Sequence, residues 1–248
     1  MKISAVIITF NEERNIGRCI DSLQDVADEV IVVDSYSTDR TQTICEQRGV
    51  MFTQRTWDDY SSQKNYGNSL AQFDYILSID ADESLSKELK QSITEIKSGT
   101  IVTAYTVNRL TNYCGRWIKH CGWYPDKKLR LWKNGEAEWN GTIHETLQHS
   151  MTGIGHLQGD LLHYSYYSIA QHVGQINRFT DLQAEKLVNA GRSPSILKIW
   201  FSPPFKFLQK YFIQGGFLDG KEGYIISRMA AYYVFLKHVK HRQRSNSK

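Results

Sequence analysis

Residues 3–9 read ISAVIIT, and the polar residues Asn11 and Glu12 follow close behind. A continuous apolar run of this length is typical of a parallel strand that is buried on both faces. EVIVVD at residues 29–34 and DYILSID at residues 74–80 are runs of the same kind, and each ends in an aspartate. The sequence therefore predicts three buried strands whose carboxyl ends carry polar side chains.

Helix signals lie between these strands. An apolar stripe at helical spacing runs through residues 16–23, and Gly49 and Gly99 close two later helical patterns. Ser86 is placed to cap the helix that follows residues 74–80. The β-α-β-α-β-α-β rhythm predicts an α/β fold with a doubly wound, mostly parallel central sheet. Because ligands bind beyond the carboxyl ends of such strands, we expect the functional site there.

The second half of the chain changes character. Residues 102–147 read as extended segments rich in tryptophan and tyrosine, and Asn134-Gly135 predicts a hairpin with a tight turn. After Ser168 the pattern is helical, with breaks predicted at Ser193-Pro194 and Pro203-Pro204.

Bulk composition narrows the class of protein. The 248 residues are 41% hydrophobic with a formal net charge of +4, which is ordinary for a globular protein and too mild for a nucleic-acid binder. Four cysteines show no metal-ligand spacing, as expected of a reduced cytosolic protein. The first apolar run is too short for a signal peptide, and no stretch reaches the ~20 apolar residues that span a membrane. We expect a cytoplasmic protein that is soluble or peripheral to a membrane.

The strongest chemical signal is Asp80-Ala81-Asp82, at the end of a predicted buried strand. Carboxylates are preferred ligands of Mg²⁺ and Mn²⁺, which often bind through a few carboxylates plus substrate phosphates. A D-x-D triplet also serves as a simple helix cap, but Ser86 already fills that position. The triplet therefore predicts a divalent-cation site.

Other polar residues are expected at the same edge of the sheet. Asp34 ends the second strand, where a carboxylate can accept hydrogen bonds from a base or a ribose hydroxyl. Thr9 and Glu12 stand at the end of the first strand, and Lys64 lies on a predicted helix, where it can pair with phosphate. The alternatives are a first-turn acid for Glu12 and a solvated helix face for Lys64.

Four blocks occur in order along the first part of the chain: VIITFNEERNI, EVIVVDSYSTDRT, SSQKNYG and YILSIDADE. In these blocks the chain resembles the GT-A fold glycosyltransferases of family 2. Two later blocks, WYPDKKLRLWKNGEAEWNGTIHETL and GGFLDGKEGYIISRMAAYYVFLKH, resemble the bacterial lipopolysaccharide-core glucosyltransferases of the WaaE/KdtX type. The common Glu-Asp acceptor motif and the QxxRW motif are missing, so the resemblance leaves the general base unassigned.

The resemblance implies an inverting, metal-dependent transfer of a hexose from a nucleotide sugar, UDP-glucose by family analogy, to a glycolipid such as the lipopolysaccharide core. It implies a GT-A catalytic domain over residues 1–165, with a nucleotide-sugar part over about 1–100 and an acceptor part over about 101–165. We expect residues 166–248 to form a helical, basic and aromatic extension. Matching positions assign Asp82 and Asp80 to the metal and diphosphate, and four residues to the nucleotide: Thr9, Glu12, Asp34 and Lys64.

Two carboxylates compete for the role of general base, of which an inverting transfer needs one. Glu145 follows the Trp139-Asn140-Gly141 stretch, and Asp126 follows Tyr124-Pro125, where an aspartate is also a routine turn residue. His144 and His163 are candidates to complete a metal shell, although a lone histidine is more often structural.

Other functions have weaker signals. A sugar-nucleotide pyrophosphorylase usually has a Gly-rich basic loop after its first strand, where this chain reads Phe10-Asn11-Glu12-Glu13. A non-catalytic nucleotide-sugar-binding protein is a second alternative, disfavoured by carboxylates at all three strand ends. A third alternative keeps the transfer and replaces the glycolipid by a peptide or a capsule precursor.

Residues 196–212 mix aromatic side chains with Lys198, Lys206 and Lys210, without a long apolar run. Such a mixture favours a segment that lies in the headgroup plane of a membrane. We therefore expect peripheral attachment to the anionic inner face of the cytoplasmic membrane. The alternative is that Trp200 and Phe205 fold back onto the catalytic domain.

Overall fold

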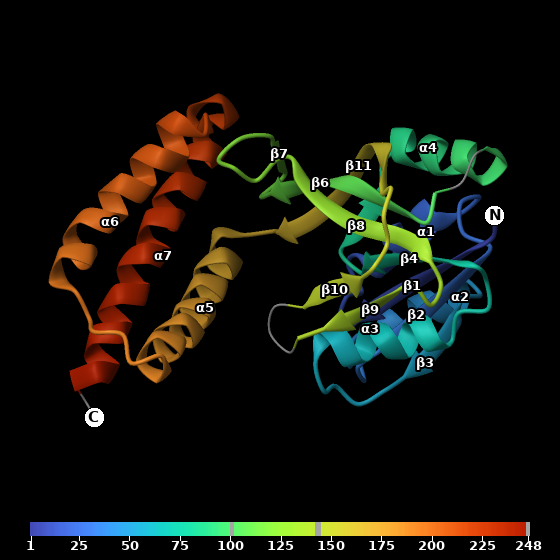
Figure 1. Cartoon of the computed structure of the whole chain (residues 1–248), viewed down its shortest axis with the longest axis horizontal. Helices are drawn as coiled ribbons and strands as arrows, with labels where there is room; N and C mark the ends of the chain where they lie inside the picture. The colour runs from blue at the N-terminus through green and yellow to red at the C-terminus, as the bar shows by residue number, and fades with distance from the viewer. Residues whose placement is uncertain (100–101, 142–144, 247–248) are drawn as a thin grey trace. The chain divides into compact units, whose positions relative to one another are not determined.

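The computed structural model describes residues 1–99, 102–141 and 145–246 (Figure 1). Its strands are β1 (Ile3–Thr9), β2 (Glu29–Asp34), β3 (Met51–Gln54), β4 (Tyr75–Asp80), β5 (Glu83–Leu85), β6 (Ala104–Tyr113), β7 (Arg116–Ile118), β8 (Asp126–Lys133), β9 (Ala137–Asn140), β10 (Thr146–His149) and β11 (Gly155–Tyr166). Its α-helices are α1 (Ile16–Leu23), α2 (Thr41–Gln47), α3 (Tyr60–Ser69), α4 (Lys87–Ser98), α5 (Ile169–Asn189), α6 (Ile196–Leu208) and α7 (Gly220–Asn246). A π-helical turn at Gln209–Ile213 and a 3-10 turn at Gly216–Asp219 connect α6 to α7.

The central sheet confirms the predicted fold class. Within the described residues, nine strands form one sheet in the order β3-β2-β1-β4-β8-β6-β11-β5, with β7 paired to β6. The first four strands are parallel, and β8 joins them antiparallel to β4. The register sets Thr9 opposite Asp34 and Ile8 opposite Asp80. Because the chain returns from β3 to add β4 on the other side of β1, the strand order reverses here, where doubly wound sheets bind ligands.

Both faces of β1 are buried, as its apolar run predicts. Ile3, Ala5 and Ile7 belong to the core cluster that includes residues of α1 and α4, whereas Val6 belongs to a second cluster. This alternation follows from the two-residue period of a strand. On α3, a Cβ added to Gly67 would lie 2.4 Å from Cγ1 of Val6, so the close approach of α3 to β1 requires glycine.

The predicted hairpin around Asn134-Gly135 is wrong. β8 ends at Lys133 and pairs with β4 and β6, whereas β9 pairs with β10 in a separate two-stranded sheet. Both edges of β8 are thus already occupied within the large sheet. β9 therefore obtains its ladder of backbone hydrogen bonds from β10.

The predicted helix break at Pro203-Pro204 is also wrong, because α6 runs through both prolines. Each proline removes a backbone N–H and weakens a helix interior. Here α6 packs along α7, and Oγ of Ser195 caps its first turn by accepting a hydrogen bond from the N–H of Lys198. The break predicted at Ser193-Pro194 is confirmed, since it separates α5 from α6.

The chain divides into two compact units. The sheet unit comprises residues 1–109 and 126–164, and the helical unit comprises residues 110–125 and 165–248. In the helical unit, α7 packs against both α5 and α6 (Figure 1). Among the residues that the structure describes, no helix is both long and apolar enough to cross a membrane.

Candidate active site

Asp80 ends β4, and both oxygens of its carboxylate are held by cations. Nζ of Lys64 lies 3.1 Å from Oδ1, and a guanidinium nitrogen of Arg130 lies 2.9 Å from Oδ2. Burial raises the pKa of Asp80, but the Lys64 and Arg130 cations outweigh burial and hold that pKa below its ordinary value. Asp80 is therefore an ionised and rigidly oriented carboxylate.

A buried charge network continues from Arg130. Its guanidinium lies 2.7 Å from Oε1 of Glu83, and Arg109 approaches the same oxygen at 3.5 Å. Oε2 of Glu83 accepts a hydrogen bond from the N–H of Asp80 at 3.0 Å. The sequence places Glu83 beside the D-x-D triplet but indicates no partner for it, and it indicates no role for Arg130 or Arg109. The available signal was Arg130 itself, a charge between Leu129 and Leu131 in a predicted strand, which needs a buried partner.

Lys64 also contacts Glu145, the first candidate for general base. Its Nζ lies 3.2 Å from Oε1 of Glu145 and 4.4 Å from the centroid of the Trp139 ring. Lys64 is buried, whereas the side chain of Glu145 keeps part of its surface exposed. One ammonium group thus joins the D-x-D aspartate to the candidate base.

Asp126, the rival candidate, is held in ion pairs. Arg109 donates to its Oδ2 at 2.9 and 2.7 Å, and Nζ of Lys128 lies 3.1 Å from Oδ1. Burial raises the pKa of Asp126, but Arg109 and Lys128 together hold that pKa below its ordinary value. A carboxylate stabilised in its ionised form is a weaker proton acceptor, so the electrostatics disfavour Asp126 as the base.

Asp82 is adjacent to His163 on β11. Oδ2 of Asp82 lies 3.2 Å from Nε2 of His163, and the backbone of Tyr164 donates a hydrogen bond to the carbonyl of Asp82. Burial lowers the pKa of His163. The hydrogen bond to Asp82 and the charge of Asp82 raise that pKa by more than burial lowers it, so the net shift is upward. His144 lies outside the described residues.

Asp82 and His163 offer two side-chain ligands for a divalent cation, which would take its remaining ligands from water or a substrate. A carboxylate and an imidazole face each other, and carboxylates suit Mg²⁺ and Mn²⁺. Outside residues 100–101, 142–144 and 247–248, no three side chains of His, Cys, Asp or Glu are grouped so that they could hold a metal ion by themselves. Such a site would need water or phosphate oxygens as further ligands, which is the usual manner of binding Mg²⁺.

The ends of β1 and β2 carry two more of the residues that the sequence predicts for the site, Thr9 and Asp34. Asp34 is fully buried, and its carboxylate accepts hydrogen bonds from the N–H and hydroxyl of Ser37 and from Gln54. Oγ1 of Thr9 is buried, and in the described part of the chain it has no hydrogen-bond partner. The side chain of Asn11 bridges to the next loop by accepting a hydrogen bond from the N–H of Thr38.

Glu12 lies near Asp82, the second aspartate of the D-x-D triplet. Its Oε2 accepts a hydrogen bond from the side chain of Asn15 at 2.7 Å. Burial raises the pKa of Glu12, the Asn15 hydrogen bond opposes this, and the nearby carboxylates of Asp82 and Asp39 add to the rise. Glu12 is thus a partly buried acid in a region that already holds several negative charges.

The tryptophans divide between the two units. Trp132 and Trp139 are buried in one core cluster and meet edge to face with ring centroids 6.1 Å apart. Trp123 belongs to the helical unit, where it packs with Tyr113 and Tyr166. Because Trp132 and Trp139 are buried, neither ring offers an open face on which an acceptor sugar could stack.

More than half of the chain matches a known protein family. Residues 4–152 match the family described as Glycosyl transferase family 2. An "Uncharacterized glycosyltransferase" of Rickettsia bellii is 35% identical and aligns with 98% of this chain and 87% of its own length. The "Lipopolysaccharide core biosynthesis glycosyltransferase LpsC" of Rhizobium meliloti is 29% identical over 98% of this chain and 93% of its own.

A solved structure shares the fold. The mannosyltransferase PcManGT from Pyrobaculum calidifontis, in complex with GDP-Man and Mn²⁺, superposes with a TM-score of 0.54. The match covers 97% of this chain and 86% of that one, at 15% sequence identity.

Proposed function

The chain belongs to glycosyl transferase family 2, and on that basis we propose that it moves a hexose from a nucleotide sugar to a glycolipid acceptor, with inversion at the anomeric carbon. The observation that carries the proposal is the contact of Lys64 with both Asp80 and Glu145 at the ligand-binding edge of the sheet. It links the aspartate expected beside the donor diphosphate to the carboxylate expected to accept a proton.

The nucleotide is assigned to the ends of β1 and β2. The buried hydroxyl of Thr9 has no partner among the described residues, and such a group normally acquires one, here from the donor. Asp34 is fixed by Ser37 and Gln54, so its carboxylate is oriented before a ribose or base arrives. PcManGT, which has the same fold, binds GDP-Man, and this supports a nucleotide-sugar donor. UDP-glucose is our first choice.

The metal is assigned to Asp82 and His163, with Asp80 as a neighbour that orients the site. Both oxygens of Asp80 are engaged by Lys64 and Arg130, which leaves Asp82 as the better direct ligand. A bound Mg²⁺ or Mn²⁺ supplies positive charge for the leaving diphosphate. The Mn²⁺ in the PcManGT complex supports this assignment.

The chain's own residues supply the remaining chemistry. Glu145 accepts the proton of the acceptor hydroxyl as that oxygen attacks the anomeric carbon from the face opposite the diphosphate. Lys64 holds Glu145 in place through a contact at 3.2 Å, and because it also contacts Asp80, its charge would attract donor phosphates bound there. Asp126 remains in its ion pairs with Arg109 and Lys128 and takes no proton.

The acceptor is proposed to be a glycolipid such as the lipopolysaccharide core. LpsC, which aligns along almost the whole chain, is named for lipopolysaccharide core biosynthesis, and this supports the class of acceptor. A peptide or a capsule precursor is the alternative acceptor for the same transfer.

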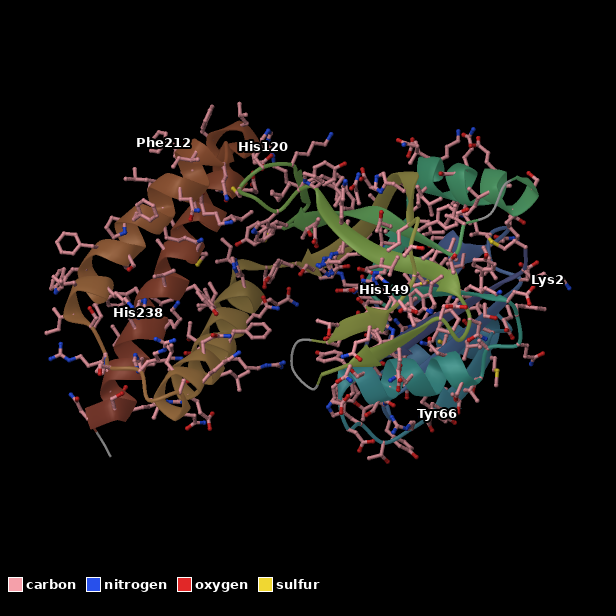
Figure 2. All side chains as sticks on the ribbon, viewed as in Figure 1. Lys2, Tyr66, His120, His149, Phe212 and His238 are labelled. Atoms are coloured by element: carbon pink, nitrogen blue, oxygen red, sulfur yellow. The ribbon has the colours of Figure 1, made fainter. Side chains whose placement is uncertain are left out.

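We further propose peripheral attachment to the inner face of the cytoplasmic membrane through α6. None of its residues is buried, and Trp200 and Phe201 are 72% and 68% exposed. From residue 186 to residue 248 the chain has twelve lysines and arginines but only two acidic residues. An exposed aromatic helix surrounded by cations is suited to the headgroup region of an anionic bilayer. Phe212, just beyond α6, also extends away from the neighbouring helices (Figure 2).

A donor panel tests the proposed activity. The protein is incubated with UDP-glucose, UDP-galactose, UDP-N-acetylglucosamine and GDP-mannose, with Mn²⁺ or EDTA, and with a lipopolysaccharide-core acceptor. We expect one donor to release nucleoside diphosphate in an acceptor-dependent manner, and only with metal. Saturable donor binding with no release under any condition would instead favour a non-catalytic binding protein.

A further inference from the structure

A groove between α6 and α7 is a separate feature of the helical unit. It has a volume of about 640 Å³ and is lined by Pro203, Pro204 and Phe207 from α6 and by Met229, Tyr232 and Phe235 from α7. Ligand pockets typically span about 300–1,000 Å³ and are mostly apolar with few polar groups. The groove thus has the size and the lining of a site for an apolar chain, and none of its residues takes part in the proposed chemistry.

Its shape follows from the residues on the two helices. The prolines of α6 and Ala231 of α7 have short side chains, whereas Phe207 and Phe235 are bulky and form walls. Tyr232 and Phe235 are 42% and 39% exposed, so these rings border an open groove and are not part of a closed core. Burying them would release apolar surface from water, which is favourable in proportion to the area covered.

One cation belongs to the groove. Arg228 lines it, and its guanidinium lies 5.7 Å from the centroid of the Phe207 ring. In the part of the chain that the structure describes, no carboxylate lies within ion-pair distance of Arg228. Three lysines lie on the same two helices: Lys198 and Lys206 on α6, and Lys237 on α7. Burial lowers the pKa of Lys237, and the positive charges of Lys198 and Lys206 lower that pKa further, so the three lysines are close to one another. The surroundings of the groove are therefore positive and carry no compensating acid on α6.

We propose that this groove binds one acyl chain of an anionic phospholipid, with Arg228 in contact with the lipid phosphate. The apolar walls of the groove accommodate the acyl chain. The guanidinium of Arg228 offers the paired N–H donors that suit the geometry of a phosphate. The exposed face of α6 continues beside the groove, so the same lipid layer covers both. The inference rests on the proposed membrane attachment and adds to it a defined site for a single lipid.

The first experiment uses a lipid that forms no membrane. Full-length protein is titrated with dihexanoyl phosphatidylglycerol below its critical micelle concentration, and bound lipid is counted by native mass spectrometry. We expect one saturable site, with weaker binding of dihexanoyl phosphatidylcholine. Arg228→Gln should weaken binding of the anionic lipid on the order of fivefold, since a basic residue near an anionic lipid contributes ~1 kcal/mol. Arg242→Gln, on the same helix and outside the groove, is the matched control and should bind normally.

A second experiment does not depend on how a variant folds. Wild-type protein is labelled with a phosphatidylglycerol whose acyl chain carries a photoreactive diazirine, and modified peptides are mapped. Labels should concentrate at residues 203–208 and 228–235, and Ala231→Phe, which fills the groove, should abolish them. Labels elsewhere, an unchanged affinity of Arg228→Gln, or a dimer that occupies the groove in light scattering would each overturn the proposal.

Vesicle sedimentation separates this inference from membrane attachment itself. Binding of phosphatidylglycerol vesicles that is unaffected by Arg228→Gln and Ala231→Phe, together with no saturable site for the short lipid, would overturn the groove and leave membrane attachment standing. A saturable, Arg228-dependent site for the short lipid in a protein that ignores vesicles would support the groove and overturn membrane attachment.

Discussion

Nζ of Lys64 lies 3.2 Å from Oε1 of Glu145, across 81 positions of the sequence. Lys64 is on α3, and Glu145 stands just before β10, the strand that pairs with β9. The contact therefore requires both the parallel half of the sheet and the small sheet beside it. It identifies Glu145 as the carboxylate that shares a cation with the D-x-D motif, which leads to our first prediction.

Glu145→Gln should lower the turnover rate by about a hundred- to ten-thousand-fold while donor affinity changes little. Glutamine keeps the size of the side chain but cannot accept the proton of the acceptor hydroxyl. Turnover is measured as acceptor-dependent release of nucleoside diphosphate, and donor affinity by calorimetry. Glu138→Gln, at an exposed position on β9, is the matched control and should be fully active. Normal turnover by Glu145→Gln together with an inactive Asp126→Asn would transfer the role to Asp126.

Asp82→Ala should abolish transfer without changing the fold, because Asp82 is an edge residue whose side chain contacts His163 and not the core. Excess EDTA should likewise stop the wild-type reaction, and Mn²⁺ or Mg²⁺ should restore it. Circular dichroism checks the fold, and Asp74→Ala, at an exposed position before β4, serves as the control. Full activity of the wild type in excess EDTA would contradict the metal assignment.

Arg130→Met should destabilise the protein by about 3–5 kcal/mol, because it leaves the carboxylates of Asp80 and Glu83 without their shared buried cation. Urea denaturation followed by tryptophan fluorescence gives the free energy of unfolding. Arg40→Met breaks an exposed ion pair with Glu13 and should cost no more than about 1 kcal/mol. Equal effects of the two substitutions would show that the buried network does not contribute as described.

Gly67→Ala and Gly174→Ala should change stability in opposite directions. At Gly67 the new methyl group would lie 2.4 Å from Cγ1 of Val6, and such overpacking costs about 1–3 kcal/mol. At Gly174, on the exposed face of α5, nothing lies within 4 Å, so the gain in helix propensity of up to ~1 kcal/mol should appear. Thermal melts of the two variants beside the wild type measure both effects. A tolerated Gly67→Ala would mean that α3 packs less closely on β1.

The stability of the helical unit should depend on pH through His172. Burial lowers the pKa of His172 to about 4, and its ring shares a hydrogen bond of 3.0 Å with the hydroxyl of Tyr113. In an unfolded chain the pKa of a histidine is ~6.5. Between these values the unfolded chain binds a proton that the folded chain does not, so the free energy of unfolding decreases as pH falls from about 6.5 towards 4. Above that window the group has no effect.

His172→Phe provides the comparison, because phenylalanine does not titrate. The stability advantage of the wild type over this variant should shrink by roughly 3 kcal/mol between pH 7 and pH 4, at about 1.4 kcal/mol per pH unit. Urea midpoints at several pH values measure it. An advantage that stays constant over that range would mean that His172 is not kept neutral by burial.

Residues near one another in sequence were the ones that could be predicted. The ends of β1, β2 and β4 follow from three apolar runs, and the cap of α4 follows from Ser86 alone. The pairing of β9 with β10 could not be predicted, since it depends on which strand edges remain open after the large sheet forms. The same holds for Arg130 with Glu83, because their contact joins β8 to β5 through long-range topology.

The anomeric configuration of the product tests the central claim most directly. The active donor from the panel, which carries its sugar α-linked to the diphosphate in the case of UDP-glucose, is incubated with acceptor and Mn²⁺. The glycosidic linkage is then read by proton NMR. We predict a single β-linked product from the wild type and almost none from Glu145→Gln. An α-linked product, or full formation of the β-linked product by Glu145→Gln, would contradict inversion by Glu145 as general base.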